Sequence, residues 1–187
     1  MLLAALLGAC GKRESPSFQL TDVTGASFGK ALDLTDHNGT RRTLADFKGK
    51  VVVLFFGFTH CPDACPTTML ELAKVAQELG PDAQRMQVLF ATVDPERDTP
   101  ELLRQYVPSF NPTFLGLYGT PEETSRAAKE FKVYFSKQPQ PGGSYTMDHS
   151  AGTFVLDQSG RLRLFGQYGA GAQPLLHDIR TLLAQQS

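Results

Sequence analysis

The sequence predicts an α/β domain in which helices cover both faces of a mixed β-sheet. Two observations support this fold class. Segments typical of strands and of helices alternate along the chain, and residues 51–56 (VVVLFF) form an unbroken β-branched and aromatic run. Such a run is typical of a central strand that is buried on both faces. At 187 residues, the chain has room for one domain and a short tail.

The other elements are justified by their local patterns. A turn at residues 36–39, between Leu34 and Leu44, predicts an N-terminal hairpin ahead of the main sheet. Apolar residues at helical spacing predict a helix over residues 67–79, which ends at Gly80. The later elements are expected in this order: a strand at 86–93, a helix that opens at 99–100, a strand at 115–118, a helix from 120 to about 131, a strand pair at 152–157 and 162–165, and a helix at 174–184.

This element order, with two cysteines directly after the first long buried strand, predicts a thioredoxin-like fold with the hairpin as an N-terminal extension. We expect the domain to span residues 18–187. The formal net charge is −1 and charges of both signs are scattered. There is accordingly no electrostatic argument for nucleic acid, which we do not expect as a partner. The sequence also lacks the run of about 18 apolar residues that a membrane-spanning helix needs.

The N-terminus resembles a lipoprotein signal. Residues 1–9 are apolar and end in the sequence LGA before Cys10, and polar residues follow. We therefore expect residues 1–9 to be a signal peptide cleaved before Cys10, lipid on Cys10, and a tether over residues 10–17. This interpretation locates the domain in a bacterial cell envelope, in the periplasm or on the outer face of the cytoplasmic membrane. The alternative is an ordinary apolar start with a spare thiol.

If Cys10 carries lipid, Cys61 and Cys65 remain as a lone pair, which can be a structural disulfide, a redox couple or a metal site. They lie in the sequence GFTHCPDACP at residues 57–66, between the buried strand and a helix. A helix N-terminus favours thiolate over thiol. The C-x-x-x-C spacing can hold two sulfurs apart as ligands and still allow a disulfide. A disulfide that closes so short a loop would add little stability.

His149 is the candidate third ligand. It precedes the predicted strand at residues 152–157, whose start lies beside the cysteine loop in a thioredoxin fold, where relatives usually carry a cis-proline. Two thiolates and an imidazole suit copper, and Cu(I) accepts three ligands. A structural zinc ion would need a fourth ligand and an iron–sulfur cluster would normally need four cysteines.

Several other residues have weaker interpretations. The Asp94 carboxylate can contact a metal-binding side chain, where it would orient that ligand or adjust the charge of a thiolate without binding the metal itself. Alternatively, it can simply cap a turn ahead of Pro95. Asp98 is expected to serve a local turn, and residues 138–145 are expected to form a mobile surface loop near His149. The remaining histidines and methionines are expected to be packing or surface residues, with Met147 as a weak further ligand candidate: His37, His60, His177, Met69 and Met147.

Three segments closely resemble the signatures of the Sco/SenC family: FTHCPDACP (58–66), VDPERDTP (93–100) and DHSAGTFVLD (148–157). The resemblance implies a thioredoxin fold that binds one copper, as Cu(I), Cu(II) or both, through Cys61, Cys65 and His149. It also implies a role in maturing the binuclear copper centre of cytochrome c oxidase subunit II, with a copper donor protein as a second partner. The main alternative is a thiol–disulfide oxidoreductase that uses Cys61 and Cys65. A thiol peroxidase is a poorer third choice.

Overall fold

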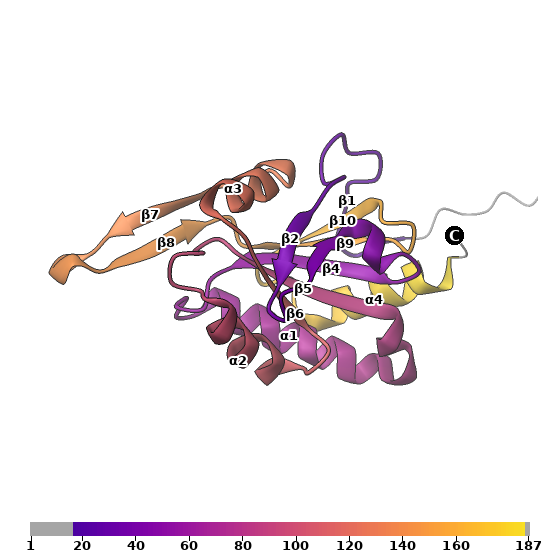
Figure 1. Cartoon of the computed structure of the whole chain (residues 1–187). Helices are drawn as coiled ribbons and strands as arrows, with labels where there is room; N and C mark the ends of the chain where they lie inside the picture. The colour runs from indigo at the N-terminus through magenta and orange to yellow at the C-terminus, as the bar shows by residue number, and fades with distance from the viewer. Residues whose placement is uncertain (1–16, 186–187) are drawn as a thin grey trace, which may run out of the picture.

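A computed structural model describes residues 17–185 of the chain (Figure 1). The predicted signal peptide, Cys10 and all but the last residue of the predicted tether lie outside the described residues. An eight-stranded sheet forms the centre of the domain, in the order β1-β10-β9-β4-β5-β6-β2-β3. These strands are β1 (Thr21–Asp22), β2 (Asp33–Asp36), β3 (Arg41–Thr43), β4 (Val51–Gly57), β5 (Met86–Thr92), β6 (Leu115–Tyr118), β9 (Gly152–Leu156) and β10 (Leu162–Gln167).

The sheet is mixed, as the sequence predicts. Strands β4, β5 and β6 are parallel to one another, whereas β9 is antiparallel to β4 and β10 is antiparallel to β9. Every residue of β4 and β5 is buried. Burial on both faces explains why these strands read as continuous apolar runs without the alternation of a half-exposed strand.

Four α-helices cover the sheet: α1 (Ala64–Leu79), α2 (Pro100–Phe110), α3 (Pro121–Glu130) and α4 (Ala172–Ala184). Helices α1, α2 and α4 lie on one face and α3 lies on the other (Figure 1). The Thr99 side chain caps α2, and a capping box formed by Thr120 and Glu123 begins α3. These are the start signals that the sequence contains. The predicted thioredoxin-like α/β arrangement is confirmed.

Both edges of the sheet are built from the N-terminal region. The predicted hairpin is present as β2 and β3, and it joins the sheet because β2 pairs with β6. The short strand β1 pairs with β10 at the opposite edge, which the sequence analysis missed. Three 3₁₀ turns complete the described part of the chain: η1 (Leu44–Phe47), η2 (Gly80–Arg85) and η3 (Pro141–Gly143).

The predicted surface loop at residues 138–145 is present as an exposed turn, but it is shorter than expected and joins two strands that were not predicted, while its mobility stays a prediction. Strands β7 (Phe135–Pro139) and β8 (Tyr145–His149) form a separate two-stranded antiparallel sheet. This β7–β8 hairpin projects away from the rest of the domain, at the left of Figure 1. Gly142 and Gly143 have positive φ angles of 83° and 79° and form its tip. The glycines and prolines therefore mark a tight turn between strands. Most residues of these strands are partly or fully exposed, so the strands lack the alternation of buried residues that would reveal them.

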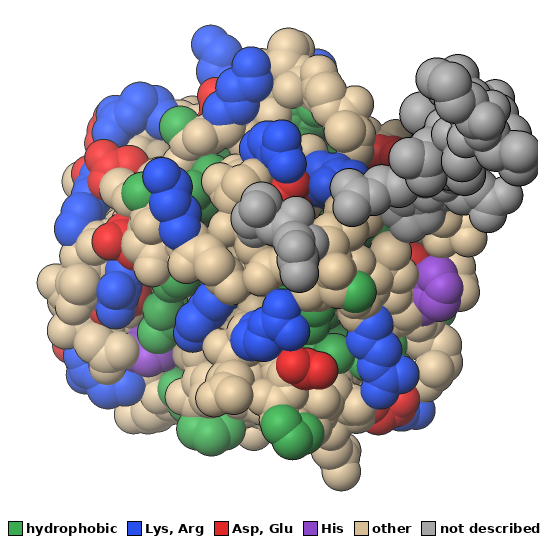
Figure 2. Space-filling model, turned by 90° about the vertical axis from the view of Figure 1, so that its right-hand side faces the viewer, with side chains coloured by type: hydrophobic (Ala, Val, Ile, Leu, Met, Phe, Trp, Pro, Cys, Tyr) green, Lys and Arg blue, Asp and Glu red, His purple; other side chains and the backbone are tan. Residues whose placement is uncertain are grey.

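The end of the domain opposite the hairpin carries a mixture of positively and negatively charged side chains (Figure 2). Within residues 17–185, no helix combines the length and the apolar character that crossing a bilayer requires.

Candidate metal centre

The two cysteines lie where β4 gives way to α1. Cys61 is in the connecting loop and is half-buried, whereas Cys65 lies in the first turn of α1 and is fully buried. The backbone N–H of Cys65 donates a hydrogen bond to the Cys61 sulfur over 3.4 Å. Helix α1 begins at Ala64, three residues before the predicted start, so it includes Cys65. The earlier start explains why free N–H groups of the helix point at the Cys61 sulfur.

Gly57, the last residue of β4, makes room for the buried sulfur. A Cβ atom at this position would lie 3.0 Å from the Cys65 sulfur and within 2.9 Å of the Phe55 and Phe90 rings. Only a residue without a side chain fits between these three groups. Gly57 was not among the predicted site residues, although a glycine directly after a strand of bulky residues is a signal of close approach.

His149 reaches the same place from a distant part of the chain. It is the last residue of β8, and its Nε2 atom lies 3.6 Å from the Cys65 sulfur. The Cys61 sulfur, the Cys65 sulfur and a His149 ring nitrogen all lie within 4.8 Å of one another. The structure therefore brings together the three side chains that the sequence analysis selected.

The orientation of the imidazole suits a metal ligand. The His149 Nδ1 atom lies 3.1 Å from the Ser150 carbonyl oxygen, an acceptor, which assigns the ring proton to Nδ1. This tautomer leaves the Nε2 lone pair directed at the sulfurs. The rings of Phe55 and Phe58 meet the imidazole edge-on, with centroids 6.3 and 5.7 Å away. These aromatic contacts hold the ring in a largely apolar corner of the site.

The two thiols differ strongly in acidity. A hydrogen bond from the Cys65 side chain lowers the pKa of Cys61 to about 5, and the backbone N–H groups of Asp63 and Cys65 act in the same direction. The same side-chain hydrogen bond raises the pKa of Cys65, and burial raises it further. The pair thus loses its first proton from the half-exposed sulfur and retains the second on the buried one. Near neutral pH, the site carries one accessible thiolate.

Asp98 is a buried carboxylate that the sequence analysis underestimated. It was expected to serve a local turn, and its N–H does donate to the Asp94 carbonyl. However, its side chain also accepts hydrogen bonds from the Thr59 N–H, the Thr59 hydroxyl and the Thr92 hydroxyl. These bonds tie the cysteine loop to the end of β5. Burial raises the pKa of Asp98, and its charge in turn helps to raise the pKa of Cys65.

Asp94 faces the β7–β8 hairpin. Its carboxylate accepts a hydrogen bond from the Tyr145 hydroxyl over 2.8 Å and forms an ion pair with Arg97. The predicted influence of Asp94 on the ligands stays a prediction, since these contacts connect it to the strand that carries His149 and not to the three ligand groups themselves.

Two other histidines, His60 beside Cys61 and His37 in a predicted turn, were expected not to be ligands. His60 is exposed, and its Nδ1 atom lies 3.1 Å from the Thr59 hydroxyl. His37 is buried in its turn, where its Nδ1 atom accepts a hydrogen bond from the Gly116 N–H. Neither belongs to the group formed by the cysteines and His149.

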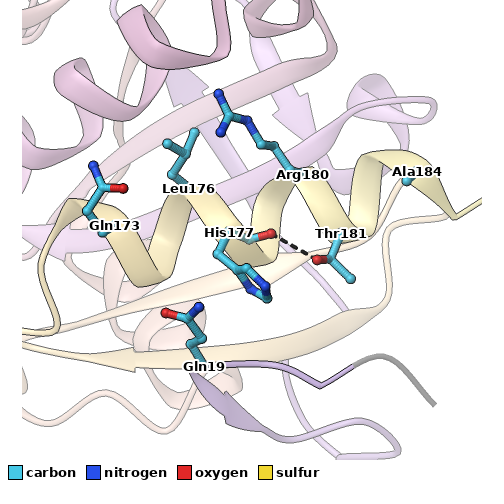
Figure 3. A pocket seen from close by; sticks show the side chains of 7 residues that line it. All are labelled: Gln19, Gln173, Leu176, His177, Arg180, Thr181 and Ala184. Atoms are coloured by element: carbon cyan, nitrogen blue, oxygen red, sulfur yellow. Dashed lines mark hydrogen bonds between the residues drawn. The ribbon is translucent and has the colours of Figure 1, made fainter. Parts of the chain in front are cut away.

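His177 lies on α4, in a groove of about 510 Å³ (Figure 3). The groove runs beside Gln19 and Arg180, and within it the Thr181 hydroxyl donates to the His177 carbonyl oxygen. No cysteine lines this groove. Met69 belongs to the core, as expected. Met147 is also buried, and it lines a cavity between the β7–β8 hairpin and residues 93–96.

The fold and this site define a class: a thioredoxin-like protein in which two thiols at a helix N-terminus meet an imidazole from a separate strand. Two sulfurs and one imidazole nitrogen form a soft donor set. The chain belongs to the SCO1/SenC family, since the SCO1/SenC family model matches residues 12–184.

Similar proteins agree with this assignment. The "Protein SCO2 homolog, mitochondrial" of Mus musculus is 38% identical over 82% of this chain and 61% of its own length. The chain thus spans about three fifths of this curated relative. The structure of Bradyrhizobium japonicum ScoI with copper bound matches with a TM-score of 0.78 and 38% identity, over 84% of this chain and all of that one. The structure of a SCO1/SenC family lipoprotein from Bacillus anthracis shares the fold, with a TM-score of 0.72 and 21% identity over 89% of this chain and 99% of its own.

Proposed function

We propose that this protein is a copper metallochaperone that binds one copper ion, as Cu(I), Cu(II) or both, through Cys61, Cys65 and His149. The observation that carries the proposal is the meeting of two sulfurs and one imidazole nitrogen within 4.8 Å. Soft thiolates with imidazole suit copper, and Cu(I) accepts trigonal coordination. A similar protein, Bradyrhizobium japonicum ScoI, has been solved with copper bound.

The copper is proposed as cargo for the binuclear centre of cytochrome c oxidase subunit II, and a copper donor protein would load the site. Cys61 is half-buried and Cys65 is buried, so an incoming thiolate approaches a bound ion from the Cys61 side. Each new ligand from the recipient can then replace one ligand of this site. Stepwise exchange keeps the ion coordinated throughout the transfer.

Metal analysis of the reduced, purified protein after addition of copper tests the binding part of this proposal. We expect one copper per chain in the parent protein and weaker retention in Cys61→Ser and His149→Ala. His177→Ala serves as the matched control, because its imidazole lies on α4 in a groove that no cysteine lines. Unchanged affinity in His149→Ala would exclude the three-ligand site.

A second function, thiol–disulfide oxidoreductase, is favoured by the unequal acidity of the two thiols. The Cys61 thiolate, with its pKa lowered to about 5 chiefly by the hydrogen bond from Cys65, would attack a disulfide of the target. This step forms a mixed disulfide and releases one target thiolate. Cys65 then loses its proton and attacks the Cys61 sulfur, which frees the second target thiolate and leaves the Cys61–Cys65 disulfide. Two electrons pass to the target.

The two functions are distinguished by His149. Reduction of a target disulfide needs only the sulfurs, so this activity is expected to survive in His149→Ala. Copper transfer to an apo-subunit is expected to fall in the same variant. If both activities fall equally, the imidazole serves the thiols themselves, and the distinction between the two functions is wrong.

We further propose that lipid on Cys10 anchors the domain to a bacterial membrane, with the site in the periplasm or outside the cytoplasmic membrane. The sequence LGAC supports this location. The relatives differ in this respect, since the Mus musculus protein is named as mitochondrial and the Bacillus anthracis protein as a lipoprotein. Expression in a bacterium with a labelled fatty acid tests the anchor. Label is expected in the parent chain and is expected to be lost in Cys10→Ser.

A further inference from the structure

The position of the imidazole depends on a part of the molecule that is outside the main sheet. His149 ends strand β8, and β8 pairs only with β7 in the two-stranded sheet. Phe135 is the register partner of His149, so both lie at the base of the hairpin. Backbone hydrogen bonds of the eight-stranded sheet therefore do not fix the hairpin on the domain, and side-chain contacts must do so.

Met147 of β8 packs in the buried core cluster, and Arg97 adds polar contacts of this kind. It lies in the loop between β5 and α2, and its guanidinium group packs 3.7 Å from the centre of the Tyr145 ring. Its Nη1 atom donates a hydrogen bond to the Tyr145 carbonyl oxygen over 2.8 Å. Its Nε atom donates to the Asp94 carboxylate. One side chain thus contacts both the main chain and the ring of the first residue of β8.

The partners of Arg97 also contact each other. The Tyr145 hydroxyl donates to the other carboxylate oxygen of Asp94 over 2.8 Å. Asp94, Arg97 and Tyr145 therefore form a closed set of contacts, which we call the hairpin clamp. An ion pair between Lys137 of β7 and Glu96 adds a second link between the hairpin and the same loop. Both of these charged groups are largely exposed, so this link is worth little by itself.

The clamp is at one end of β8 and the imidazole is at the other. Tyr145 and His149 are four residues apart in one extended strand, a separation of about 13 Å at the usual rise per residue. Just after His149, the Ser150 N–H donates to the Tyr134 carbonyl. That bond lies within the base of the hairpin, so it does not fix the orientation of the hairpin against the domain.

We propose that Arg97 is a positioning residue: through the hairpin clamp it holds β8 at the angle that keeps the His149 ring beside the Cys65 sulfur. Arg97 itself does not touch the proposed metal. Its consequence for copper rests on the proposed function, whereas its effect on the position of His149 does not. The closing experiments separate these two parts.

The first experiment uses the metal-free, reduced protein. NMR spectra of the parent chain are expected to contain nuclear Overhauser contacts between the His149 ring and the Phe58 ring. Arg97→Ala is expected to weaken these contacts strongly, and Tyr145→Phe is expected to weaken them less because only the hydroxyl is removed. Arg180→Ala, which removes an exposed arginine on α4, serves as the control. If the contacts persist in a folded Arg97→Ala protein, the proposal is wrong whether or not the protein binds copper.

The second experiment measures copper affinity in a double-mutant cycle of Arg97→Ala and His149→Ala. Loss of a residue that orients a metal ligand typically weakens binding roughly 10- to 100-fold. We expect about a tenfold loss for Arg97→Ala alone, and no further loss when it is added to His149→Ala. Equal losses in both backgrounds would show that Arg97 acts through general stability, which would overturn the proposal.

If Arg97→Ala does not fold, the Tyr145→Phe protein tests the role of the hairpin clamp in its place. Its matched control is Tyr134→Phe, which removes an exposed hydroxyl at the base of the hairpin. Tyr145→Phe is expected to weaken copper binding by a few-fold and Tyr134→Phe not at all. If His149→Ala has no effect on copper affinity, the proposed ligand set fails, and the NMR contacts alone then decide the role of Arg97.

Discussion

The sulfurs and the imidazole come from two regions that are built differently. The cysteine side follows β4, a central strand of seven residues that are all buried, and continues into α1. The imidazole side is the exposed β7–β8 hairpin, which projects from the domain (Figure 1). A packed core fixes the first region, while a few side-chain contacts fix the second. The difference predicts that the positions of the two sulfurs depend on the core and that the position of the imidazole depends on the contacts of the hairpin.

The two regions are expected to contribute unequally to copper affinity, and this difference is the largest expected effect. Cys65→Ser removes a charged, soft ligand that is fixed in α1. Loss of a residue that only orients a ligand weakens metal binding by up to roughly 100-fold, and we expect copper affinity to fall by more than this in Cys65→Ser. His149→Ala removes a neutral ligand on the hairpin, and its loss is expected to be smaller. Titration against a competing chelator measures both. A larger loss in His149→Ala would contradict the comparison.

The next prediction concerns packing. Gly57→Ala places a methyl group within 3.0 Å of the Cys65 sulfur and of two aromatic rings, so we expect the free energy of unfolding to fall by about 1–3 kcal/mol. Ser144→Ala, near the hairpin tip, changes an exposed side chain and is expected to alter the free energy of unfolding by less than about 0.5 kcal/mol. Urea unfolding measures both variants. Equal changes would show that the hairpin is as tightly packed as the core.

The lowered pKa of Cys61 is expected to be independent of the hairpin. The pKa of Cys61 is lowered to about 5, chiefly by the hydrogen bond from Cys65, and the charge of His149 contributes least among the causes. The alkylation rate of Cys61 is expected to stay nearly constant from pH 8 down to pH 6 and to fall below pH 5. In urea, the rate is expected to fall about tenfold per pH unit over pH 8 to pH 6, as for an ordinary thiol.

The same pH profile is expected in His149→Ala, because the main causes of the lowered pKa lie on the cysteine side. Mass spectrometry of the peptide that contains Cys61 measures the rate. A shift of the midpoint toward pH 8 in His149→Ala would show that the imidazole sets the charge of the sulfur, and the two regions would then not be independent.

The sequence is informative about the cysteine side for a physical reason. A continuous apolar run can only be a buried strand or helix, and the GFTHCPDACP segment after it contains the breaks that end one element and begin the next. The fold class and the two cysteine ligands could therefore be predicted, whereas His149 was selected from its place just before the predicted strand at residues 152–157. The same logic explains why Thr120 and Glu123, a capping pair three residues apart, correctly predicted the start of α3.

The hairpin and the buried carboxylates could not be predicted in the same way. The strands β7 and β8 consist mainly of partly or fully exposed residues, with Met147 buried, so their sequence lacks the alternating buried face that would reveal them. The hydrogen bonds of Asp98 to Thr59 join positions 39 residues apart, and the contact of Arg97 with Tyr145 spans 48 residues. Such pairs are set by the tertiary fold, and local patterns do not record them.

X-ray absorption at the copper edge of the reduced, copper-loaded protein tests the central claim most directly. The account predicts two sulfur scatterers and one nitrogen scatterer from imidazole around each copper ion, and loss of the imidazole signal in His149→Ala with the sulfur signal retained. A shell of sulfur alone in the parent protein, or an imidazole signal that survives in His149→Ala, would contradict it.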